Sequence, residues 1–203
     1  DSPFICSGKF AFKVKDCVMP VVAKNTGVPP DETQFELPFN KEDMGSEQCF
    51  DEIKEGLKDL SVRTLLFLNH IEVLEWAVGR EVERFRRVEK KNNRVVIVLE
   101  NDDESVAEKS MEFLRFSDDK NDASKLKTAV AFELERNKVK PCRGSVAVVF
   151  PLVKETSNLM FHISASFETD AGRSSLLDKP YNEEKMQEVG KLVADSLHKL
   201  KDL

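Results

Sequence analysis

The chain has 203 residues, which is enough for one large domain or two small ones with hydrophobic cores. Hydrophobic residues make up 40% of it and charged residues 33%, as in globular proteins and unlike disordered ones. The net charge of −6 argues against a nucleic-acid-binding protein, and no apolar run approaches the roughly 18 residues needed to cross a bilayer. Neither nucleic acid nor a membrane is therefore expected as a partner.

The four cysteines lie far apart and form no C-x-x-C pair. This spacing favours reduced thiols in a cytoplasmic or nuclear protein over a disulfide scaffold or a zinc site, although disulfides stay open as an alternative. The chain begins Asp1-Ser2-Pro3, with neither an initiator methionine nor the layout of a signal peptide. We expect it to be a segment cut from a longer protein.

Strands are predicted in the first part of the chain. Residues 9–15 alternate apolar and basic side chains, which indicates a half-buried strand. Residues 18–22 can pair beside it at a sheet edge, because Pro20 has no amide hydrogen to donate. Residues 33–39 predict another strand. The side chains expected to face inward from it are Phe35, Leu37 and Phe39.

Two helices are predicted next. Residues 46–60 have an apolar stripe at the helical period, and Ser46 can cap the first turn. This stripe consists of Phe50, Ile53, Leu57 and Leu60. Residues 62–68 are expected to form a shorter apolar helix. The sequence changes in character after this helix pair, so we expect two parts, residues 1–70 and residues 71–203.

The second part predicts a long antiparallel meander. Its strands and hairpins are expected at residues 71–76, 81–99, 109–117, 128–134, 145–152 and 161–167. The hairpin over residues 81–99 turns at residues 91–93. In the segments at 128–134 and 161–167 the larger apolar side chains recur at every second position, whereas residues 145–152 are continuously apolar, like an inner strand.

A helix is predicted at the end of the chain, starting near Asn182, which is expected to cap it after Pro180. Its apolar face is expected to contain Met186, Val189, Val193, Leu197 and Leu200. Together these elements predict an α+β fold, in which mixed or antiparallel β-rich sheets accompany a central helix pair and a C-terminal helix.

The spacing of titratable residues predicts no catalytic or metal site. His162 is expected on the outward face of its strand, and none of the three histidines is spaced from another His, Cys or acid as metal ligands are. The basic stretch at residues 80–94 is interleaved with glutamates, which is typical of a solvated hairpin face. No glycine-rich phosphate loop occurs either. Spacing alone therefore predicts no enzyme.

One segment of the first part resembles a known fold. Residues 33–39 (T-Q-F-E-L-P-F), an acidic linker and the following helix resemble the last strand and next helix of the GHKL ATPase fold, found in the ninety-kilodalton heat-shock chaperones. In that family a Gly-Thr begins this strand, and the threonine lies near the adenine pocket. Thr33 matches the threonine, which implies an adenine-pocket wall, but Glu32 replaces the glycine.

Three further segments resemble sacsin/NO VEIN-type proteins, which carry such an ATPase domain. They are L-L-F-L-N-H-I at residues 65–71, S-V-A-V-V-F-P-L at residues 145–152 and F-H-I-S-A-S-F at residues 161–167. The first ten residues are similar to the segment after the family's glycine-rich lid. The resemblance covers nearly the whole chain in order. It implies that the residues binding ATP and Mg²⁺ would precede residue 1.

The resemblance also implies a role for Arg173. The chaperone family's middle domain supplies an arginine, from a loop before a helix, that reaches the γ-phosphate and stabilises charge during phosphoryl transfer. Arg173 lies in a comparable loop, and Gly172 lets the backbone approach a ligand. The other interpretation of Arg173 is an ion pair with Asp170 or Asp178, or a cap on a strand end.

The family resemblance thus implies a fragment of a chaperone-like ATPase that relays nucleotide state to protein clients or partners. ATP and Mg²⁺ would bind only in the intact parent, and no activity is expected of this chain alone. The alternative is a non-catalytic interaction scaffold in a pseudo-ATPase relative, which Glu32 favours. A small free-standing enzyme is a third interpretation.

Overall fold

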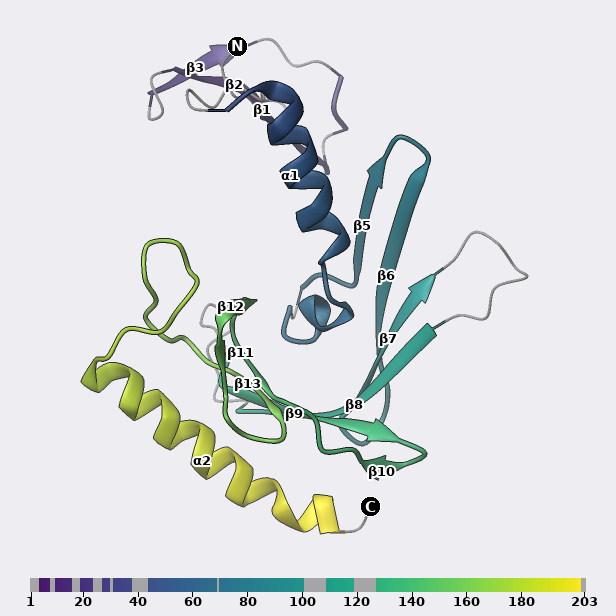
Figure 1. The fold of residues 1–203 in the computed structure, drawn as a ribbon, viewed down its shortest axis with the longest axis vertical. Helices are drawn as coiled ribbons and strands as arrows, with labels where there is room; N and C mark the ends of the chain where they lie inside the picture. The colour runs from purple at the N-terminus through teal and green to yellow at the C-terminus, as the bar shows by residue number, and fades with distance from the viewer. Residues whose placement is uncertain are drawn as a thin grey trace. The chain divides into compact units, whose positions relative to one another are not determined.

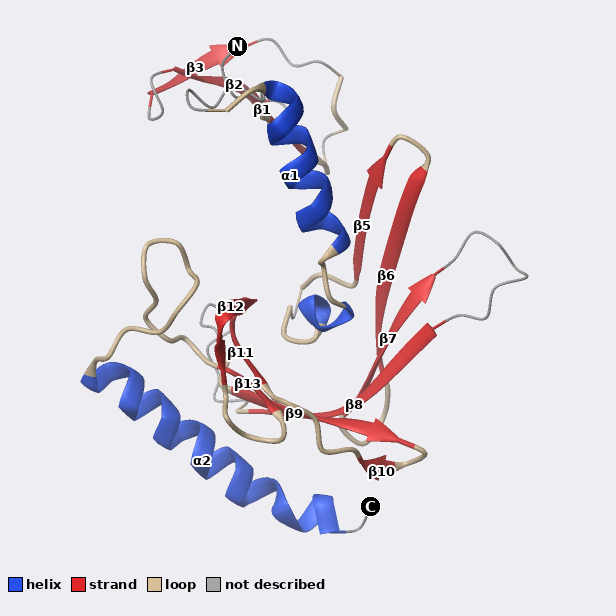
Figure 2. Ribbon diagram, in the orientation of Figure 1, coloured by secondary structure: helices blue, strands red, loops and turns tan. Residues whose placement is uncertain are grey.

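The chain folds as two compact units, Asp1–Asp59 and Leu60–Leu203, the first and second units below. The computed structural model describes residues 4–7, 10–15, 19–23, 27–29, 31–37, 44–68, 70–100, 109–118 and 127–201. Residues 60–70, which the sequence pattern placed in the first part, group with the second. The expected α+β class, with mostly antiparallel strands and a C-terminal helix, is confirmed (Figure 2).

The first unit contains a four-stranded antiparallel sheet in the order β3-β2-β1-β4. Its strands are β1 (Phe4–Ser7), β2 (Phe10–Lys15), β3 (Met19–Ala23) and β4 (Thr33–Glu36). β3 pairs with β2 and lies at the edge of the sheet, as predicted from Pro20. β1 was not predicted, and it pairs with both β2 and β4.

The prediction that Phe35 and Leu37 face inward is wrong. Their side chains are 62% and 70% exposed, and the strand ends at Glu36. Alternation along a strand shows which side chains share a face, but it does not show whether anything covers that face. Phe39, the third residue of this prediction, lies outside the described residues.

The helix α1 spans Ser46–Lys58 and is preceded by Gly45, which makes no side-chain capping bond. The prediction that Ser46 caps the helix is therefore wrong, because Ser46 already lies in its first turn. On the predicted apolar stripe, Phe50 and Ile53 are exposed, and the buried side chain of the helix is Cys49. Apolar side chains of α1 are thus partly exposed, like those at β4.

The second unit is built on a nine-stranded sheet (Figure 1). Its main path runs β12-β11-β13-β9-β8-β7-β6-β5, and β10 pairs with β9. The strands are β5 (Val73–Val78), β6 (Glu81–Glu89), β7 (Arg94–Glu100), β8 (Lys109–Ser117), β9 (Ala129–Glu135), β10 (Lys138–Val139), β11 (Ser145–Val148), β12 (Phe150–Thr156) and β13 (His162–Ser164). Among the strands that the structure describes, β11 and β13 alone pair in parallel. The predicted hairpin turn is confirmed, with Asn92 and Asn93 in the left-handed region.

The single inner strand predicted for residues 145–152 is wrong. The chain reverses at Val149, whose φ is 78°, and Val148 pairs with Phe150 across the turn. β12 is consequently an edge strand, where Pro151 removes no needed hydrogen bond. A run of apolar residues indicates burial, but it contains no information on where the chain turns.

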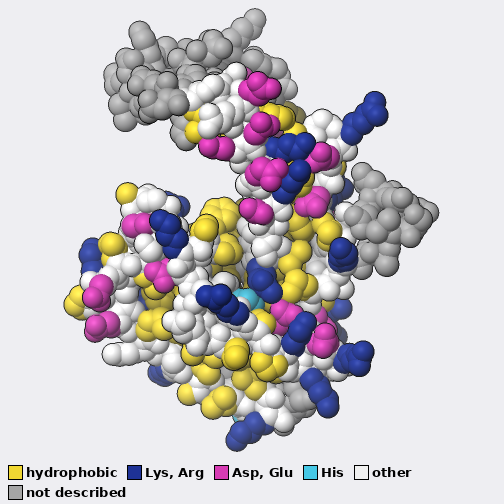
Figure 3. Space-filling model, viewed as in Figure 1, with side chains coloured by type: hydrophobic (Ala, Val, Ile, Leu, Met, Phe, Trp, Pro, Cys, Tyr) yellow, Lys and Arg dark blue, Asp and Glu magenta, His cyan; other side chains and the backbone are white. Residues whose placement is uncertain are grey.

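The helix α2 (Pro180–Lys201) packs against β8 and β9, and hydrophobic side chains gather between it and the sheet (Figure 3). Met186 and Leu197, predicted on the inner face, are exposed. The side chains that pack inward from the helix are Val189, Leu192, Val193 and Leu200. Asn182 lies inside the helix and is not its cap, because its side chain bonds to the backbone of Glu168 and Leu177.

The opposite face of the same sheet is covered by the 3-10 turn η1 (Val62–Leu65), the second member of the predicted helix pair. The guanidinium groups of Arg87 and Arg115 donate hydrogen bonds to backbone carbonyls in and just after this turn. Arg87 is buried, so the prediction of a solvated basic face is wrong for it, whereas Arg84 and Arg86 are exposed and paired with glutamates. Cover on both faces explains why Ala129–Leu134 are all buried instead of alternating.

In the part of the chain that the structure describes, no helix combines the length and the apolar character needed to cross a membrane.

Candidate functional site

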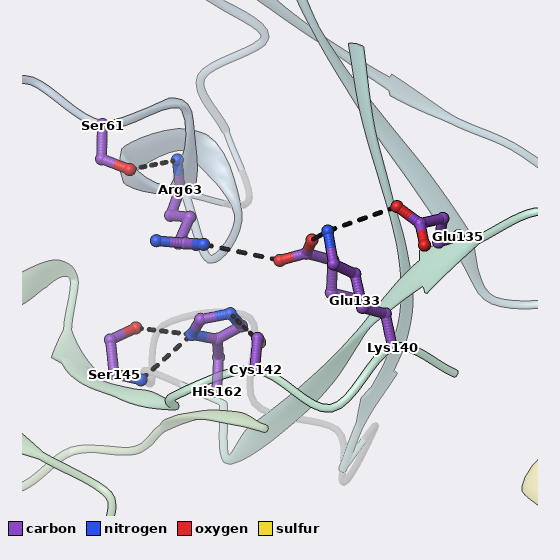
Figure 4. Close-up of polar contacts among 8 residues, drawn as sticks. All are labelled: Ser61, Arg63, Glu133, Glu135, Lys140, Cys142, Ser145 and His162. Carbon is purple, nitrogen blue, oxygen red and sulfur yellow. Dashed lines mark hydrogen bonds and ion pairs between the residues drawn. The ribbon is translucent and has the colours of Figure 1, made fainter. Parts of the chain in front are cut away.

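A cluster of polar side chains lies on the sheet face that η1 covers (Figure 4). It contains Glu133 of β9, His162 of β13, Cys142 from the loop before β11, and Arg63 of η1. One ligand atom each of Glu133, Cys142 and His162 lie within 4.8 Å of one another. Among the described residues this group combines side chains that commonly bind metals or act as nucleophiles, so it is the candidate site.

Strand alternation brings the cluster together. Phe132 and Leu134 point into the core under α2, so Glu133 between them points to the opposite face. Phe161 and Ile163 also pack toward α2, which turns His162 the same way as Glu133. The β13–β9 pairing then places these two residues, distant in sequence, near each other.

The prediction of an outward-facing His162 is wrong. Its side chain is 0% exposed, and its ring packs edge-on against Phe113 with centroids 6.0 Å apart. Phe161 and Ile163 do lie on one side as predicted, but η1 also covers the other side. The expectation that no histidine approaches another metal-ligand type is likewise wrong, because strand pairing achieves what local spacing does not.

The hydrogen bonds of His162 define the position of its ring proton. The backbone N–H of Ser145 donates to Nδ1 over 3.0 Å, and the Ser145 hydroxyl lies 2.8 Å from the same atom. Nδ1 therefore acts as the acceptor, and the proton of the neutral ring lies on Nε2. Nε2 is 3.4 Å from Sγ of Cys142, to which it donates.

Burial lowers the pKa of His162 to about 4, and the nearby charge of Arg63 acts in the same direction. The carboxylate of Glu133 acts against this shift but does not overcome it. The imidazole is therefore neutral at physiological pH.

The pKa of the Cys142 thiol is raised, chiefly by burial and next by the negative charge of Glu133. The positive charges of Arg63 and Lys140 act in the opposite direction without reversing the shift. Cys142 is thus a protonated thiol at physiological pH.

Glu133 is a buried carboxylate with two cationic partners. Nζ of Lys140 lies 3.1 Å from Oε1, and the guanidinium of Arg63 lies 3.4 Å from Oε2. Lys140 also pairs with Glu135 at the exposed side of the strand. The pair with Arg63 ties η1 to β9, and burial of an ion pair requires partners of this kind.

These protonation states limit the chemistry of the cluster. A Cys–His nucleophile needs a histidine that accepts the thiol proton, whereas Nε2 of His162 donates to Cys142. The three ligand types suit Zn²⁺, but the metal would have to displace the thiol proton and the Nε2 proton and compete with two cations for Glu133. The geometry fits a structural polar network better than a reactive centre.

The sequence pattern did not mark Glu133, Cys142, His162 or Arg63 as residues of a functional site. A usable signal was present for two of them. Glu133 interrupts the apolar run A-V-A-F-E-L, and His162 stands between Phe161 and Ile163. A polar residue in such a run is buried with partners when both faces of its strand are covered.

The two residues singled out from the sequence belong to different units. Thr33 begins β4 opposite Ser7 and is exposed. Arg173 is exposed, at a φ of 51°, in the turn that the Thr169–Leu176 bridge closes. The alternative of an Arg173–Asp170 ion pair is not favoured, because the Asp170 carboxylate accepts hydrogen bonds from its two serine neighbours. These neighbours are Ser174 and Ser175, each through its amide and its hydroxyl.

No protein-family model, curated protein or solved structure matches this chain. The assignment of function therefore rests on the residues themselves.

Proposed function

We propose that the chain is part of a chaperone-like protein of the GHKL ATPase type. Its first unit would contribute to the nucleotide-binding domain, and its second unit would relay nucleotide state to protein clients or partners. The observation that carries this proposal is the exposed apolar side chains of the first unit. Phe35 and Leu37 at β4 and Ile53 on α1 are exposed. Apolar surface of this extent is usually covered by further protein.

The order of elements supports the same proposal. β4 begins at Thr33 and is followed by α1, as in the last strand and next helix of the GHKL fold. In this setting Thr33 borders the adenine pocket, and ATP with Mg²⁺ binds in the intact parent. The parent would act in the cytoplasm or the nucleus, with protein clients or partners as its ligands.

The turn around Arg173 supports a phosphate-directed role for this residue. A left-handed φ is unfavourable for a residue with a side chain, and it persists only where the surroundings impose it. Here the serine hydrogen bonds to Asp170 hold the turn, and they lower the pKa of Asp170 to about 2. Arg173 is thereby presented to solvent from an ordered turn.

A second candidate function is a non-catalytic interaction scaffold. It is favoured by apolar side chains exposed in and after the edge strand β12, among which Val153 is 91% exposed. Phe150 and Met160 are exposed as well. Such side chains can bind partners without any nucleotide.

Calorimetry with Mg-ATP separates the two functions. The chain alone should release no heat of binding, whereas a protein extended upstream should bind Mg-ATP if the ATPase proposal holds. In that longer protein, Arg173→Ala should lower ATP turnover and leave ATP binding unchanged, while Arg143→Ala, at another exposed loop arginine, should change neither. Failure of the longer protein to bind Mg-ATP would favour the scaffold, and unchanged turnover in Arg173→Ala would remove its proposed role.

A client-binding assay tests the scaffold. The chain should slow the aggregation of a chemically unfolded model protein, and Val153→Lys should weaken this effect. Leu197→Lys is the matched control, because Leu197 is an exposed apolar residue on α2. Equal loss of protection in both variants would mean that β12 is not the client surface.

A further inference from the structure

A basic hollow lies in the second unit where β6 ends, β7 begins, β8 ends and β9 begins. It encloses about 430 Å³. Among the residues that line it are His70, Glu89, Lys90, Arg94, Arg115 and Lys127. None of these belongs to the polar cluster around His162 or to the proposed nucleotide-binding residues. The hollow is therefore a separate feature that the proposed function does not use.

Positive side chains outnumber carboxylates among the described lining residues of the hollow. These residues include two lysines, two arginines and one carboxylate, that of Glu89, and Arg94 is also paired with Glu112 just outside the lining, whereas the chain as a whole carries a net charge of −6. Glu89 is already paired with Arg115 over 2.6 Å. The strand ends thus concentrate positive charge locally against the overall charge of the protein.

The two guanidinium groups are held in position before any ligand binds. Arg115 donates to the Leu66 carbonyl over 3.0 Å as well as to Glu89. Arg94 donates to Glu112 over 3.0 Å and to Asn137 over 2.8 Å. Both arginines are half-buried. A solvated surface cluster of lysines would have no such anchoring, and groups that are ordered in advance lose less entropy on binding.

We propose that this hollow binds a small phosphorylated molecule through Lys90, Arg94, Arg115 and Lys127. Guanidinium groups match the oxygens of a phosphate in paired hydrogen bonds, and lysines add point charges. The volume exceeds that of a single phosphate ion and leaves space for a pyrophosphate or a phosphate monoester. A long polyanion is disfavoured, because nucleic-acid binding needs an extended basic surface and this protein is negatively charged overall.

The test is a titration of the full chain with sodium pyrophosphate at constant ionic strength, followed by amide NMR shifts or calorimetry. Saturable binding is expected. Lys90→Gln should weaken it by about 3- to 10-fold, since one charge-assisted contact is lost. Lys154→Gln removes an exposed lysine of β12 instead and should leave the affinity unchanged. Glu89→Gln should strengthen binding by a similar factor, because it removes a carboxylate from the described lining of the hollow.

Lys90→Gln and Glu89→Gln should change the affinity for pyrophosphate in opposite directions, and this pair of results is specific to binding in this hollow. Equal weakening by Lys90→Gln and Lys154→Gln, or weaker binding in Glu89→Gln, would overturn the proposal, as would the absence of saturation. Tighter, Lys90-dependent binding of an RNA oligonucleotide than of pyrophosphate would overturn the small-molecule assignment. A nucleoside monophosphate compared with inorganic phosphate then shows whether the organic group contributes. None of these results depends on an upstream ATP site.

Discussion

The backbone N–H of Ser145 donates a hydrogen bond of 3.0 Å to Nδ1 of His162, and this contact places the imidazole proton on Nε2. Nε2 in turn donates to Sγ of Cys142, and the nearby Glu133 carboxylate raises the pKa of that thiol. Every member of this chain has one favoured protonation state. The cluster consequently stabilises the fold as a neutral pair of His and Cys beside one compensated carboxylate.

The pH dependence of stability should report the buried imidazole. The pKa of His162 is about 4 in the folded state against 6.5 ordinarily, so the unfolded state binds more protons between these values. Stability is therefore fully present above pH 6.5 and falls, by about 3 kcal/mol, as the pH drops toward about 4. Urea unfolding at a series of pH values measures this slope.

His162→Gln should flatten that slope, whereas His198→Gln, which changes an exposed histidine of α2, should preserve it. An unchanged slope in His162→Gln would contradict the buried neutral imidazole. The carboxyl of Asp170 titrates in a separate window, because its pKa is lowered from 3.8 to about 2.

Cys142 should react slowly with iodoacetamide near neutral pH, because burial and Glu133 raise the pKa of its thiol. Glu133→Gln should accelerate the reaction and shift its pH profile downward. Glu135→Gln is the matched control, since Glu135 shares the partner Lys140 but is not among the groups that raise the thiol pKa. A background in which Cys6, Cys17 and Cys49 are changed to Ser leaves Cys142 as the single thiol in the measurement. Equal rates in both glutamate variants would contradict the role of Glu133.

Added Co²⁺ should bind the cluster weakly. Coordination by Cys142 and His162 would release the thiol proton, move the ring proton from Nε2 to Nδ1 and break the contact between the ring and the thiol. We therefore expect no thiolate-to-metal charge-transfer band at equimolar Co²⁺ near neutral pH. A strong band that disappears in Cys142→Ser would show that the cluster binds a metal ion in spite of its hydrogen bonds, and would contradict this prediction.

Local patterns were sufficient to predict much of the sheet. Lys109–Ser117 was predicted with its observed bounds, and the turn at Asn92 and Asn93 follows from residues that tolerate the left-handed region. These features depend on neighbours in sequence. The reversal at Val149 was missed, because the apolar residues around it contain no turn signal.

The candidate site could not be predicted because it depends on which elements pack over each face of the sheet. Alternation correctly placed His162 on the opposite side of its strand from Phe161 and Ile163. Whether that side is exposed to solvent is decided by η1, which precedes His162 in the chain by about a hundred residues. The same limit applies to Phe35, which alternation placed inward and which nothing in the described part buries. Periodicity defines faces, and tertiary packing decides which faces are core.

Asn182 should be among the polar residues most sensitive to substitution. It is buried, its Oδ1 accepts from the amide of Glu168 over 2.8 Å, and its Nδ2 donates to the carbonyls of Glu168 and Leu177. Asn182→Ala leaves these backbone groups without partners and should lower the free energy of unfolding by about 2 to 4 kcal/mol. Asn182→Asp should cost more, because a carboxylate would face two carbonyl oxygens. Glu183→Ala, at the exposed neighbouring position, should have little effect in the same urea titration.

Gly144 lies where two loop segments cross. Its N–H donates to the Leu159 carbonyl over 3.0 Å, and its own carbonyl accepts from Ser157 over 3.1 Å. A Cβ at this position would overlap the carbonyl oxygen of Phe161 and the hydroxyl of Ser157. The serine side chain can rotate away, but the carbonyl of Phe161 belongs to the backbone that enters β13 and cannot move alone.

Gly144→Ala should therefore lower the free energy of unfolding by about 3 kcal/mol or more. Gly172→Ala is the matched control, because nothing lies within 4 Å of a Cβ there, and its effect should stay within about 0.5 kcal/mol. Adding Ser157→Gly to Gly144→Ala should restore little stability, since the backbone overlap remains. The displaced Phe161 carbonyl directly precedes His162, so the folded variant should also show a changed His162 titration by NMR. Wild-type stability in Gly144→Ala would contradict this close backbone crossing.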